Sequence, residues 1–294
     1  MHFVNAKTIL TPHSMNIYRG CSHGCIYCDS RSKCYQFTHD FEDIEVKQNA
    51  PELLEAALKK KRKRCMIGTG SMCDPYIPLE KELQLTRRCL EIIDHYNFGA
   101  TLITKSDLVL RDFDILTHIN QKTKAVVQMT LTTADDTLCK KIEPNVCPTS
   151  RRFEVLHACH EAGIPTVVWF SPLLPFINDT KENIEGIVDL CARAGVHAII
   201  CFGIGLTLRE GNREYFYAAL DRNFQSLSAD QISLKQRYIK TFGYNYMVNS
   251  PNSHALMSYL SQLCKRNNIM LGTDSVFKWI EEFPDKDPLQ PELF

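Results

Sequence analysis

The feature that most constrains the fold is a regular alternation of strand-like and helix-like stretches between Lys47 and Gly205. Helix patterns, with apolar residues at three- and four-residue spacing, cover residues 51–61, 79–96, 135–142, 150–163 and 181–195. Short apolar runs typical of strands cover residues 65–70, 100–106, 125–133, 164–172 and 197–203. With one more strand in residues 16–20, this alternation predicts about six parallel strands joined by right-handed helical crossovers.

Glycines and a repeat support this interpretation. Gly99, Gly163 and Gly195 each lie just before a strand-like run, as expected of helix C-terminal caps. Residues 160–170 and 192–202 also resemble each other and are about one strand–helix unit apart.

The alternation of strands and helices ends near residue 205. We expect an N-terminal extension (1–12), a core (13–205) and a C-terminal region (206–294).

The C-terminal region has a different pattern. Residues 212–224 and 253–268 look helical, while residues 238–253 look aromatic and loop-like. We expect this region to cover the mouth of the core. Tyr238, Tyr244 and Tyr246 are expected to serve in packing rather than in substrate contact.

Composition excludes several classes of protein. The chain has 34 basic and 34 acidic residues, so no overall charge attracts it to nucleic acid or to an anionic membrane. No apolar run approaches the roughly 20 residues that span a bilayer. Thirteen cysteines without a signal segment favour a reducing cytoplasm. Six of them fall in apolar patterns and are expected to be core residues: Cys65, Cys89, Cys159, Cys191, Cys201 and Cys264.

Three of the cysteines have a spacing that predicts metal chemistry. Cys21, Cys25 and Cys28 form a C-x3-C-x2-C pattern with Tyr27 before the last thiol. Three thiolates can hold a 4Fe–4S cluster and leave one iron open, because such a cluster takes four ligands. The alternatives are a zinc site completed by His23 or Cys34, and a closed, non-catalytic iron–sulfur centre with Cys34 as fourth ligand.

Residues 15–31, MNIYRGCSHGCIYCDSR, resemble the radical S-adenosylmethionine (radical SAM) enzymes, in particular the spore photoproduct lyase-like subgroup. The resemblance implies an α/β fold with a partial (β/α)6 barrel and an active site at the C-terminal ends of the strands. It also implies a 4Fe–4S cluster held by the three cysteines, SAM chelated at the open iron, and a 5'-deoxyadenosyl radical that removes hydrogen from a substrate. An electron donor such as flavodoxin or ferredoxin follows from the same chemistry.

The resemblance also suggests residues that bind SAM. Gly68, Thr69, Gly70 and Ser71 occupy the place of the glycine-rich segment that contacts the SAM amino group. Residues 142–165 resemble the region in which a basic residue contacts the SAM carboxylate. That residue is carried over to Arg151, with its neighbour Arg152 as the alternative, because only one of two adjacent helical residues can face inward.

Further contacts are expected at the strand ends. Thr130 or Thr132 would bind the ribose, Ser171 and Pro172 would flank the adenine, and Tyr27 would lie near the cofactor. Three more residues follow the third strand and would either line the cavity or form an internal ion pair or helix cap: Lys105, Arg111 and Asp112.

The substrate is left open, with nucleic acid among its candidates. In the lyases, a cysteine after the second strand and a tyrosine after the last cluster thiol serve hydrogen transfer; here Ser71 and Asp29 stand in those places. The candidates for catalysis are therefore Cys73, Tyr27 and Asp29. A DNA-lesion lyase that uses Cys73 is the second hypothesis. The basic run 59–64, KKKRKR, is expected to be a solvated helix end rather than a nucleic-acid site.

Overall fold

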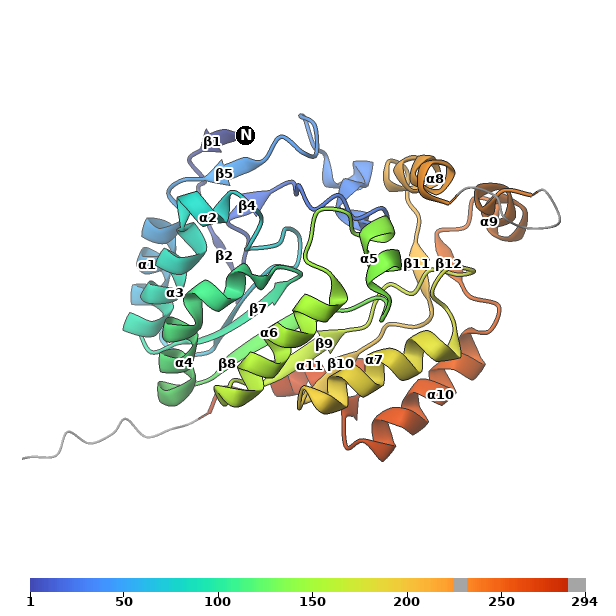
Figure 1. Ribbon diagram of the computed structural model, residues 1–294. Coiled ribbons are helices and arrows are strands. Elements are labelled where there is room, and N and C mark those ends of the chain that lie inside the picture. Colours follow the sequence, from blue (N-terminus) through green and yellow to red (C-terminus); the bar gives the residue numbers. More distant parts are fainter. Residues whose placement is uncertain (225–231, 285–294) are drawn as a thin grey trace, which may run out of the picture.

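The computed structural model describes residues 1–224 and 232–284 of the chain (Figure 1). Its centre is an eight-stranded sheet with the order β13-β10-β9-β8-β7-β6-β3-β2. All neighbours in this sheet run parallel except β2 and β3, which run antiparallel. Its strands are β2 (Leu10–Thr11), β3 (Ser14–Met15), β6 (Met66–Thr69), β7 (Gly99–Thr104), β8 (Ala125–Thr130), β9 (Thr166–Trp169), β10 (Ala198–Ile200) and β13 (Met270–Leu271).

Two small sheets accompany the large one. Strands β1 (His2–Val4), β5 (Glu45–Lys47) and β4 (Tyr18–Arg19) form a three-stranded sheet near the N-terminus. Strands β11 (Gly205–Thr207) and β12 (Met247–Asn249) form an antiparallel ribbon. In the described residues the edge strands β2 and β13 do not pair with each other, so the large sheet is an open barrel.

Helices cover one face of the large sheet (Figure 1). Between the strands lie α1 (Ala50–Lys60), α2 (Glu80–Leu83), α3 (Leu85–His95), α4 (Phe113–Lys122), α5 (Asp136–Ile142), α6 (Thr149–Glu161) and α7 (Lys181–Arg193). Short 3-10 turns are η1 (Asp29–Arg31), η2 (Lys33–Tyr35) and η3 (Asp107–Asp112). The C-terminal region adds α8 (Asn212–Asn223), α9 (Leu234–Phe242), α10 (Ser253–Arg266) and α11 (Thr273–Glu281).

Local sequence explains several of these helices. Pro51 lies in the first turn of α1, where its missing N–H costs no hydrogen bond. The Thr180 hydroxyl accepts from the Asn183 N–H and caps α7. The apolar sides of these helices then pack on the sheet, and the central strand β8 is buried along its whole length because both of its faces are covered.

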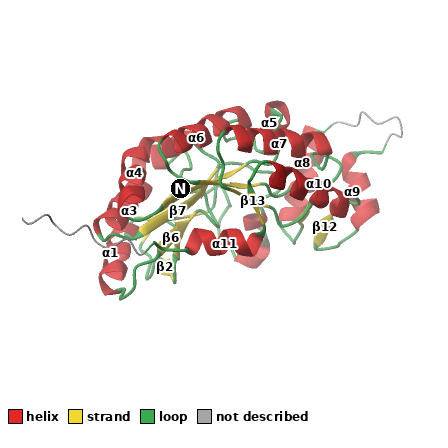
Figure 2. Cartoon of the chain, turned by 90° about the horizontal axis from the view of Figure 1, so that it is seen from below, coloured by secondary structure: helices red, strands yellow, loops and turns green. Residues whose placement is uncertain are grey.

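Helix α11 covers the other face of the sheet. Figure 2 shows it on the opposite side of the strands from α4, α6 and α7. Val276 and Ile280 of α11 are buried against residues near the starts of the strands, among them Met66, Val126 and Val167. The final described helix therefore fills the N-terminal end of the barrel interior, and the C-terminal ends of the strands are left for a site.

The predicted α/β fold with a parallel sheet is confirmed, and the five strands expected after residue 47 are all present. The strand expected in residues 16–20 is not part of the large sheet: β4 pairs with β5, and β3 takes its place beside β6. A seventh parallel strand, β13, comes from the C-terminal region. The boundary expected at residue 205 is thus crossed by the sheet.

Other expectations need correction. Helix α4 was not predicted, and the helix expected over 79–96 is broken at Gln84, which has a left-handed conformation (φ 51°). Gly163 and Gly195 do have positive φ after α6 and α7, but Gly99 begins β7, and Asn97 takes the left-handed position there. Residues 238–253 contain the end of α9 and all of β12 rather than only loop.

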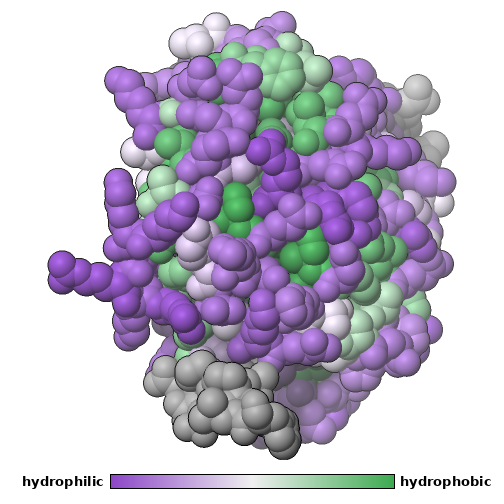
Figure 3. All heavy atoms as spheres, turned by 90° about the vertical axis from the view of Figure 1, so that its left-hand side faces the viewer, coloured by the Kyte–Doolittle hydropathy of each residue, from purple (hydrophilic) through white to green (hydrophobic). Residues whose placement is uncertain are grey.

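The basic run 59–64 begins in the last turn of α1 and continues to just before the N-terminal end of β6. The side of the molecule where α1, α3 and α4 lie is largely hydrophilic, with scattered apolar patches (Figure 3). This placement agrees with a solvated surface. Among the described helices, none combines the length and the apolar character that crossing a membrane requires.

Five of the six cysteines expected in the core are buried: Cys89, Cys159, Cys191, Cys201 and Cys264. Cys65 is half-buried, with its sulfur 3.4 Å from the His13 Nδ1. All thirteen cysteines are free thiols. A free cysteine in a core behaves as a small apolar residue, so these positions need no chemistry.

Candidate functional site: a three-cysteine cavity

Cys21, Cys25 and Cys28 line one cavity of about 420 Å³ at the C-terminal ends of the strands. They lie on the loop between β4 and η1, which backbone contacts fix in place. The Cys21 N–H donates to the Phe41 carbonyl (3.2 Å), and the Ile26 N–H donates to the Ile142 carbonyl (2.9 Å). The three thiols are thus presented from one loop toward one space.

The cavity also brings together residues from distant strands. Predicted site residues that line it are Tyr27, Asp29, Gly70, Ser71, Cys73, Lys105, Ser171 and Pro172. They come from the cluster loop and from the segments after β6, β7 and β9. The sequence rhythm predicts this meeting, because parallel strands end at the same edge of a sheet.

Gly70 is where the chain turns from β6 into the cavity wall. Its φ is +99°, and a Cβ there would lie 2.2 Å from the Ile103 carbonyl oxygen. Only glycine allows this backbone to pass so close to β7. The glycine therefore sets the position of Ser71 and Cys73 beside the three cysteines.

Cys73 is a fourth thiol in the cavity wall. It is buried, and its sulfur lies 2.7 Å from the Gly20 carbonyl oxygen. Its hydrogen bond with Cys21, together with burial, raises the pKa of Cys73 well above its usual range. The same hydrogen bond and the nearby charge of His23 outweigh burial and lower the pKa of Cys21 to about 6. Cys73 is therefore a protonated thiol, while Cys21 is prepared to be a thiolate ligand.

Burial has the opposite effect on the other two cysteines of the motif. It raises the pKa of Cys25 well above its usual range and raises that of Cys28 as well, while Lys105 partly opposes both changes. A bound metal would favour the thiolate forms of both, because a coordinating thiol loses its proton.

Lys105 supplies positive charge to this cavity. Burial would lower its pKa, but Cys25, Glu143 and Asp74 raise it above its ordinary value. No hydrogen bond or ion pair joins its ammonium group to any residue within 1–224 and 232–284. A partly buried, protonated ammonium with free donors is suited to bind an anionic group.

Asp74 organises the wall around Lys105. Its carboxylate accepts from the Thr104 hydroxyl (2.7 Å) and the Lys105 N–H (2.7 Å), and it lies 3.0 Å from His23 Nε2. Burial would raise the pKa of Asp74, but the charge and hydrogen bond of His23 lower it to about 2. The carboxylate is ionised and joins the cluster loop to the end of β7.

Tyr27 leads from the cavity to a buried ion pair. Its hydroxyl donates to Glu143, whose carboxylate pairs with Arg152 at 2.6 Å. The side chains of Glu143 and Arg152 are fully buried. Arg152 also donates to the carbonyls of Thr130 and Cys147 (both 2.9 Å), so its guanidinium is engaged by the protein. This network positions the last part of the cluster loop.

A profile of the Radical SAM superfamily matches residues 15–191, more than half of the chain. This stretch contains the three cysteines and most of the cavity wall. The chain belongs to the radical SAM superfamily. Membership implies a 4Fe–4S cluster and SAM. The donor set fits these groups, because three thiols face one open cavity that also holds a free cation.

Relatives of known sequence support this assignment. An uncharacterized protein of Methanocaldococcus jannaschii is 33% identical over 169 residues, covering 57% of this chain and 62% of that protein. The chain thus spans less than two thirds of that relative. An uncharacterized protein of Mycobacterium tuberculosis is 26% identical over 244 residues, covering 79% of this chain and 70% of that one.

Solved structures show the same fold. A spore photoproduct lyase mutant has a TM-score of 0.65 at 13% identity and covers 92% of this chain and 80% of that chain. Spore photoproduct lyase complexed with dinucleoside spore photoproduct gives a TM-score of 0.63 at the same identity and coverage. The predicted radical SAM fold of the lyase-like type is confirmed.

Several expected SAM contacts of this radical SAM chain lie outside the cavity lining. Gly68 and Thr69 are inside β6, and Thr69 is buried there. Thr130 and Thr132 are buried, and the Thr132 hydroxyl lies 3.5 Å from Glu143 rather than in the cavity. None of these four residues is among those that line the cavity.

The two adjacent arginines are separated by the helix turn. Arg151 is 41% exposed and pairs with Asp107 (2.9 Å) and Glu154 (2.5 Å), away from the cavity. Arg152 faces inward, but its partner is Glu143. Neither guanidinium lines the cavity, and Lys105 is the cation that does.

The other two candidates after β7 have a structural role. Arg111 pairs with Glu80 and with its neighbour Asp112, both at 2.8 Å. The carboxylates of Glu80 and Asp112 are fully buried. Of the two alternatives for these residues, the structure supports the internal ion pair.

Asp29 and Cys34 lie together at the edge of the site. The Asp29 carboxylate accepts from Tyr35 (3.0 Å) and lies 3.3 Å from the Arg209 guanidinium. Cys34 is exposed, its sulfur is 3.1 Å from Arg209 Nη1, and it does not line the cavity. The structure does not bring Cys34 together with the three cysteines of the motif.

Sequence reasoning missed the apolar mouth of the cavity. Trp169, Phe202 and Met247 line it, and Phe202 and Met247 are more than half exposed. Trp169 is held by a hydrogen bond from its Nε1 to Gln128 (2.7 Å). Trp169 could have been predicted to line the cavity, because it lies at the end of a strand. Met247 could not, because the sequence of residues 238–253 predicts a loop.

The three tyrosines of the C-terminal region have different roles. Tyr238 is buried and donates to the Pro175 carbonyl (2.6 Å), so packing is confirmed there. Tyr244 is 89% exposed, and Tyr246 is partly exposed with its hydroxyl on Arg209. Packing is therefore the wrong interpretation for Tyr244 and Tyr246.

Proposed function

We propose that the protein is a radical SAM enzyme whose cluster is held by Cys21, Cys25 and Cys28. When bound, the cluster and SAM would supply a 5'-deoxyadenosyl radical that removes a hydrogen atom from the substrate. The observation that carries this proposal is the meeting of the three thiols on one cavity of about 420 Å³, a size typical of small-molecule sites.

The chain's own residues have separate tasks in this proposal. Lys105 would hold the carboxylate of SAM, because it lines the cavity, its pKa is raised and its ammonium has no partner among the described residues. The turn at Gly70 and Ser71 faces the same space and is proposed to contact the amino group. Trp169 and Pro172 form an apolar side, where they would exclude water from the reacting atoms, and Ser171 lies beside them in the lining.

The test is anaerobic cluster reconstitution followed by reduction with dithionite in the presence of SAM. We expect a brown protein with four irons per chain and formation of 5'-deoxyadenosine. Cys25→Ser should lose the cluster and the product, while the matched variant Cys34→Ser should keep both. Loss of the cluster in Cys34→Ser would instead support a closed or non-catalytic centre.

A DNA-lesion lyase is the second candidate, and one observation favours it. Cys73 is a buried, protonated thiol in the cavity wall, as a hydrogen-atom donor would need to be. The lyase of similar fold is complexed with dinucleoside spore photoproduct. Incubation with that dinucleoside should give repaired thymidine dinucleotide in the wild type and not in Cys73→Ala. Repair that survives in Cys73→Ala would exclude this role.

Members of this superfamily need a reductant. For this chain we propose a flavodoxin or ferredoxin and a cytoplasmic location. Reduction of the cluster by a purified flavodoxin, followed by electron paramagnetic resonance, would test the first of these. Failure of both proteins to reduce a cluster that dithionite reduces would exclude them.

A further inference from the structure

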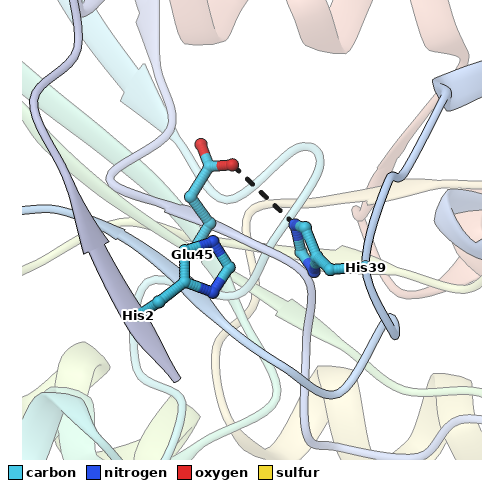
Figure 4. Close-up of side chains that lie close together, drawn as sticks. All are labelled: His2, His39 and Glu45. Carbon is cyan, nitrogen blue, oxygen red and sulfur yellow. Dashed lines mark ion pairs between the residues drawn. The ribbon is translucent and has the colours of Figure 1, made fainter.

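A second group of metal-ligating side chains lies away from the cavity. His2 of β1, His39 of the loop before β5, and Glu45 of β5 lie close together (Figure 4). One ligand atom from each lies within 4.8 Å of the others. None of the three lines the cysteine cavity.

Hydrogen bonds fix which nitrogen of each histidine carries the proton. His2 Nδ1 lies 3.0 Å from the Asp43 carboxylate, and His39 Nδ1 lies 2.9 Å from the Asp40 carbonyl. Both oxygens can only accept, so each Nδ1 must donate. In the neutral rings each Nε2 then carries a lone pair. A hydrogen bond from the other ring nitrogen to a carboxylate or carbonyl is typical of metal-bound histidines.

The lone pair of His39 has no partner among the described residues. Its Nε2 is buried without a hydrogen bond, and it faces a Glu45 oxygen 3.8 Å away. Two acceptors therefore face each other across this gap. Arg19 also lies 3.8 Å from the same Glu45 oxygen, which is a long ion pair that does not reach His39.

The two imidazoles are also in edge contact, with ring centroids 4.8 Å apart. A single divalent ion would satisfy both lone pairs and the carboxylate at once.

We propose that His2, His39 and Glu45 bind a divalent transition-metal ion of the zinc class. Two imidazoles and one carboxylate are a usual ligand set for zinc, and calcium or magnesium would require oxygen ligands. Tetrahedral zinc places its ligand atoms roughly 3.4 Å apart, so side-chain movements of about 1 Å would close the site. The fourth position is left for water, because both Asp43 oxygens are already engaged, one by His2 Nδ1 and one by the N-terminal ammonium.

The ion would stabilise the segment that carries the cluster loop. His39 contacts Phe37 (5.5 Å between ring centroids), and Phe37 contacts Phe41 (5.2 Å). The Phe41 carbonyl accepts the Cys21 N–H. The same Phe41 carbonyl oxygen lies 2.5 Å from the position that a Cβ of Gly20 would take, so it is in close contact with the backbone of Gly20. The ion would thus fix the peptide next to the first cluster ligand.

The experiment uses the full chain with its cluster reconstituted, without a histidine tag, and washed anaerobically with a chelator. Zinc is titrated by calorimetry, and bound zinc is measured by mass spectrometry after gel filtration. We expect one zinc ion per chain. His39→Gln and Glu45→Gln should each raise the Kd at least about tenfold, while His118→Gln, an exposed histidine that pairs with Asp94, should leave it unchanged.

Cobalt distinguishes this site from the cysteines. Cobalt bound at His2, His39 and Glu45 should show d–d absorption without a thiolate charge-transfer band. A charge-transfer band, an unchanged Kd in both His39→Gln and Glu45→Gln, or no zinc uptake by the wild type would each overturn the proposal. Zinc uptake by the wild type can be measured without any variant. The proposal can therefore be tested even if His39→Gln folds poorly.

Discussion

Arg152→Met tests whether the buried ion pair, rather than SAM, is the function of that arginine. The substitution keeps an apolar stem of similar length but removes a guanidinium that is fully buried 2.6 Å from Glu143. Burial would raise the pKa of Glu143, and Arg152 is the main group that lowers it. Without Arg152, the carboxylate must remain charged with only Lys105 and Tyr27 nearby or take up a proton.

The magnitude follows from the uncompensated charge. Breaking one side of a buried pair costs about 3–5 kcal/mol of the free energy of unfolding. At roughly 2–4 °C per kcal/mol for a large domain, Tm should fall by about 6–20 °C. Adding Glu143→Gln should recover more than half of this loss, because the buried charge is then removed as well.

Arg151→Met is the matched control. Arg151 is next in sequence but 41% exposed, and its pairs with Asp107 and Glu154 are at the surface. Exposed pairs contribute less than about 1 kcal/mol. Denaturant titration of anaerobically prepared protein, followed by circular dichroism, measures both variants. If Arg152→Met and Arg151→Met lose the same free energy within about 1 kcal/mol, the buried-pair argument is refuted.

Three further predictions concern the cavity. Lys105→Met should raise the Kd for SAM about 10–100-fold, since a hydrogen bond to a charged group contributes about 1.5–3 kcal/mol, and should leave the iron content unchanged. Gly70→Ala should lower the free energy of unfolding by at least about 2 kcal/mol, because its Cβ would meet the Ile103 carbonyl at 2.2 Å. Iron analysis should find cluster in Cys34→Ser and none in Cys25→Ser.

Each of these has a contrary outcome. A Kd for SAM that changes less than about threefold in Lys105→Met would assign the carboxylate to another group. Normal stability of Gly70→Ala would mean that the turn after β6 can move away from β7. Equal iron content in the two cysteine variants would remove Cys25 from the ligand set.

The sequence predicts the parts of the fold that repeat. Five strands and most of their helices follow from periodicity, and the strand order then places the segments after β6, β7 and β9 at one edge. Short strands are different. Strand β13 has two residues and β4 has two, so neither has a pattern from which its partner could be predicted.

The site was predictable only where backbone position decides it. The cysteine spacing and the turn at Gly70 set positions that lie in the cavity lining. Which of Arg151 and Arg152 faces inward depends on the rotation of α6 about its axis. The pattern of polar and apolar residues does not predict this rotation, because the inward side of α6 includes the charged Arg152. The sequence includes Lys105 among the residues that could line the cavity but does not identify it as the cation that faces the cysteines. Its charge and its lack of a partner depend on residues that are distant in the sequence.

The last described helix has a consequence for the order of biosynthesis. Phe277 of α11 contacts both Trp169 and Phe202, with ring centroids 5.9 and 6.3 Å apart, and these two residues form a wall of the cavity. The cysteine loop leaves the ribosome well before α11, because α11 follows it far along the chain. A nascent chain thus displays the three thiols before the cavity wall behind them is supported, so the cavity is complete only after α11 has been synthesised.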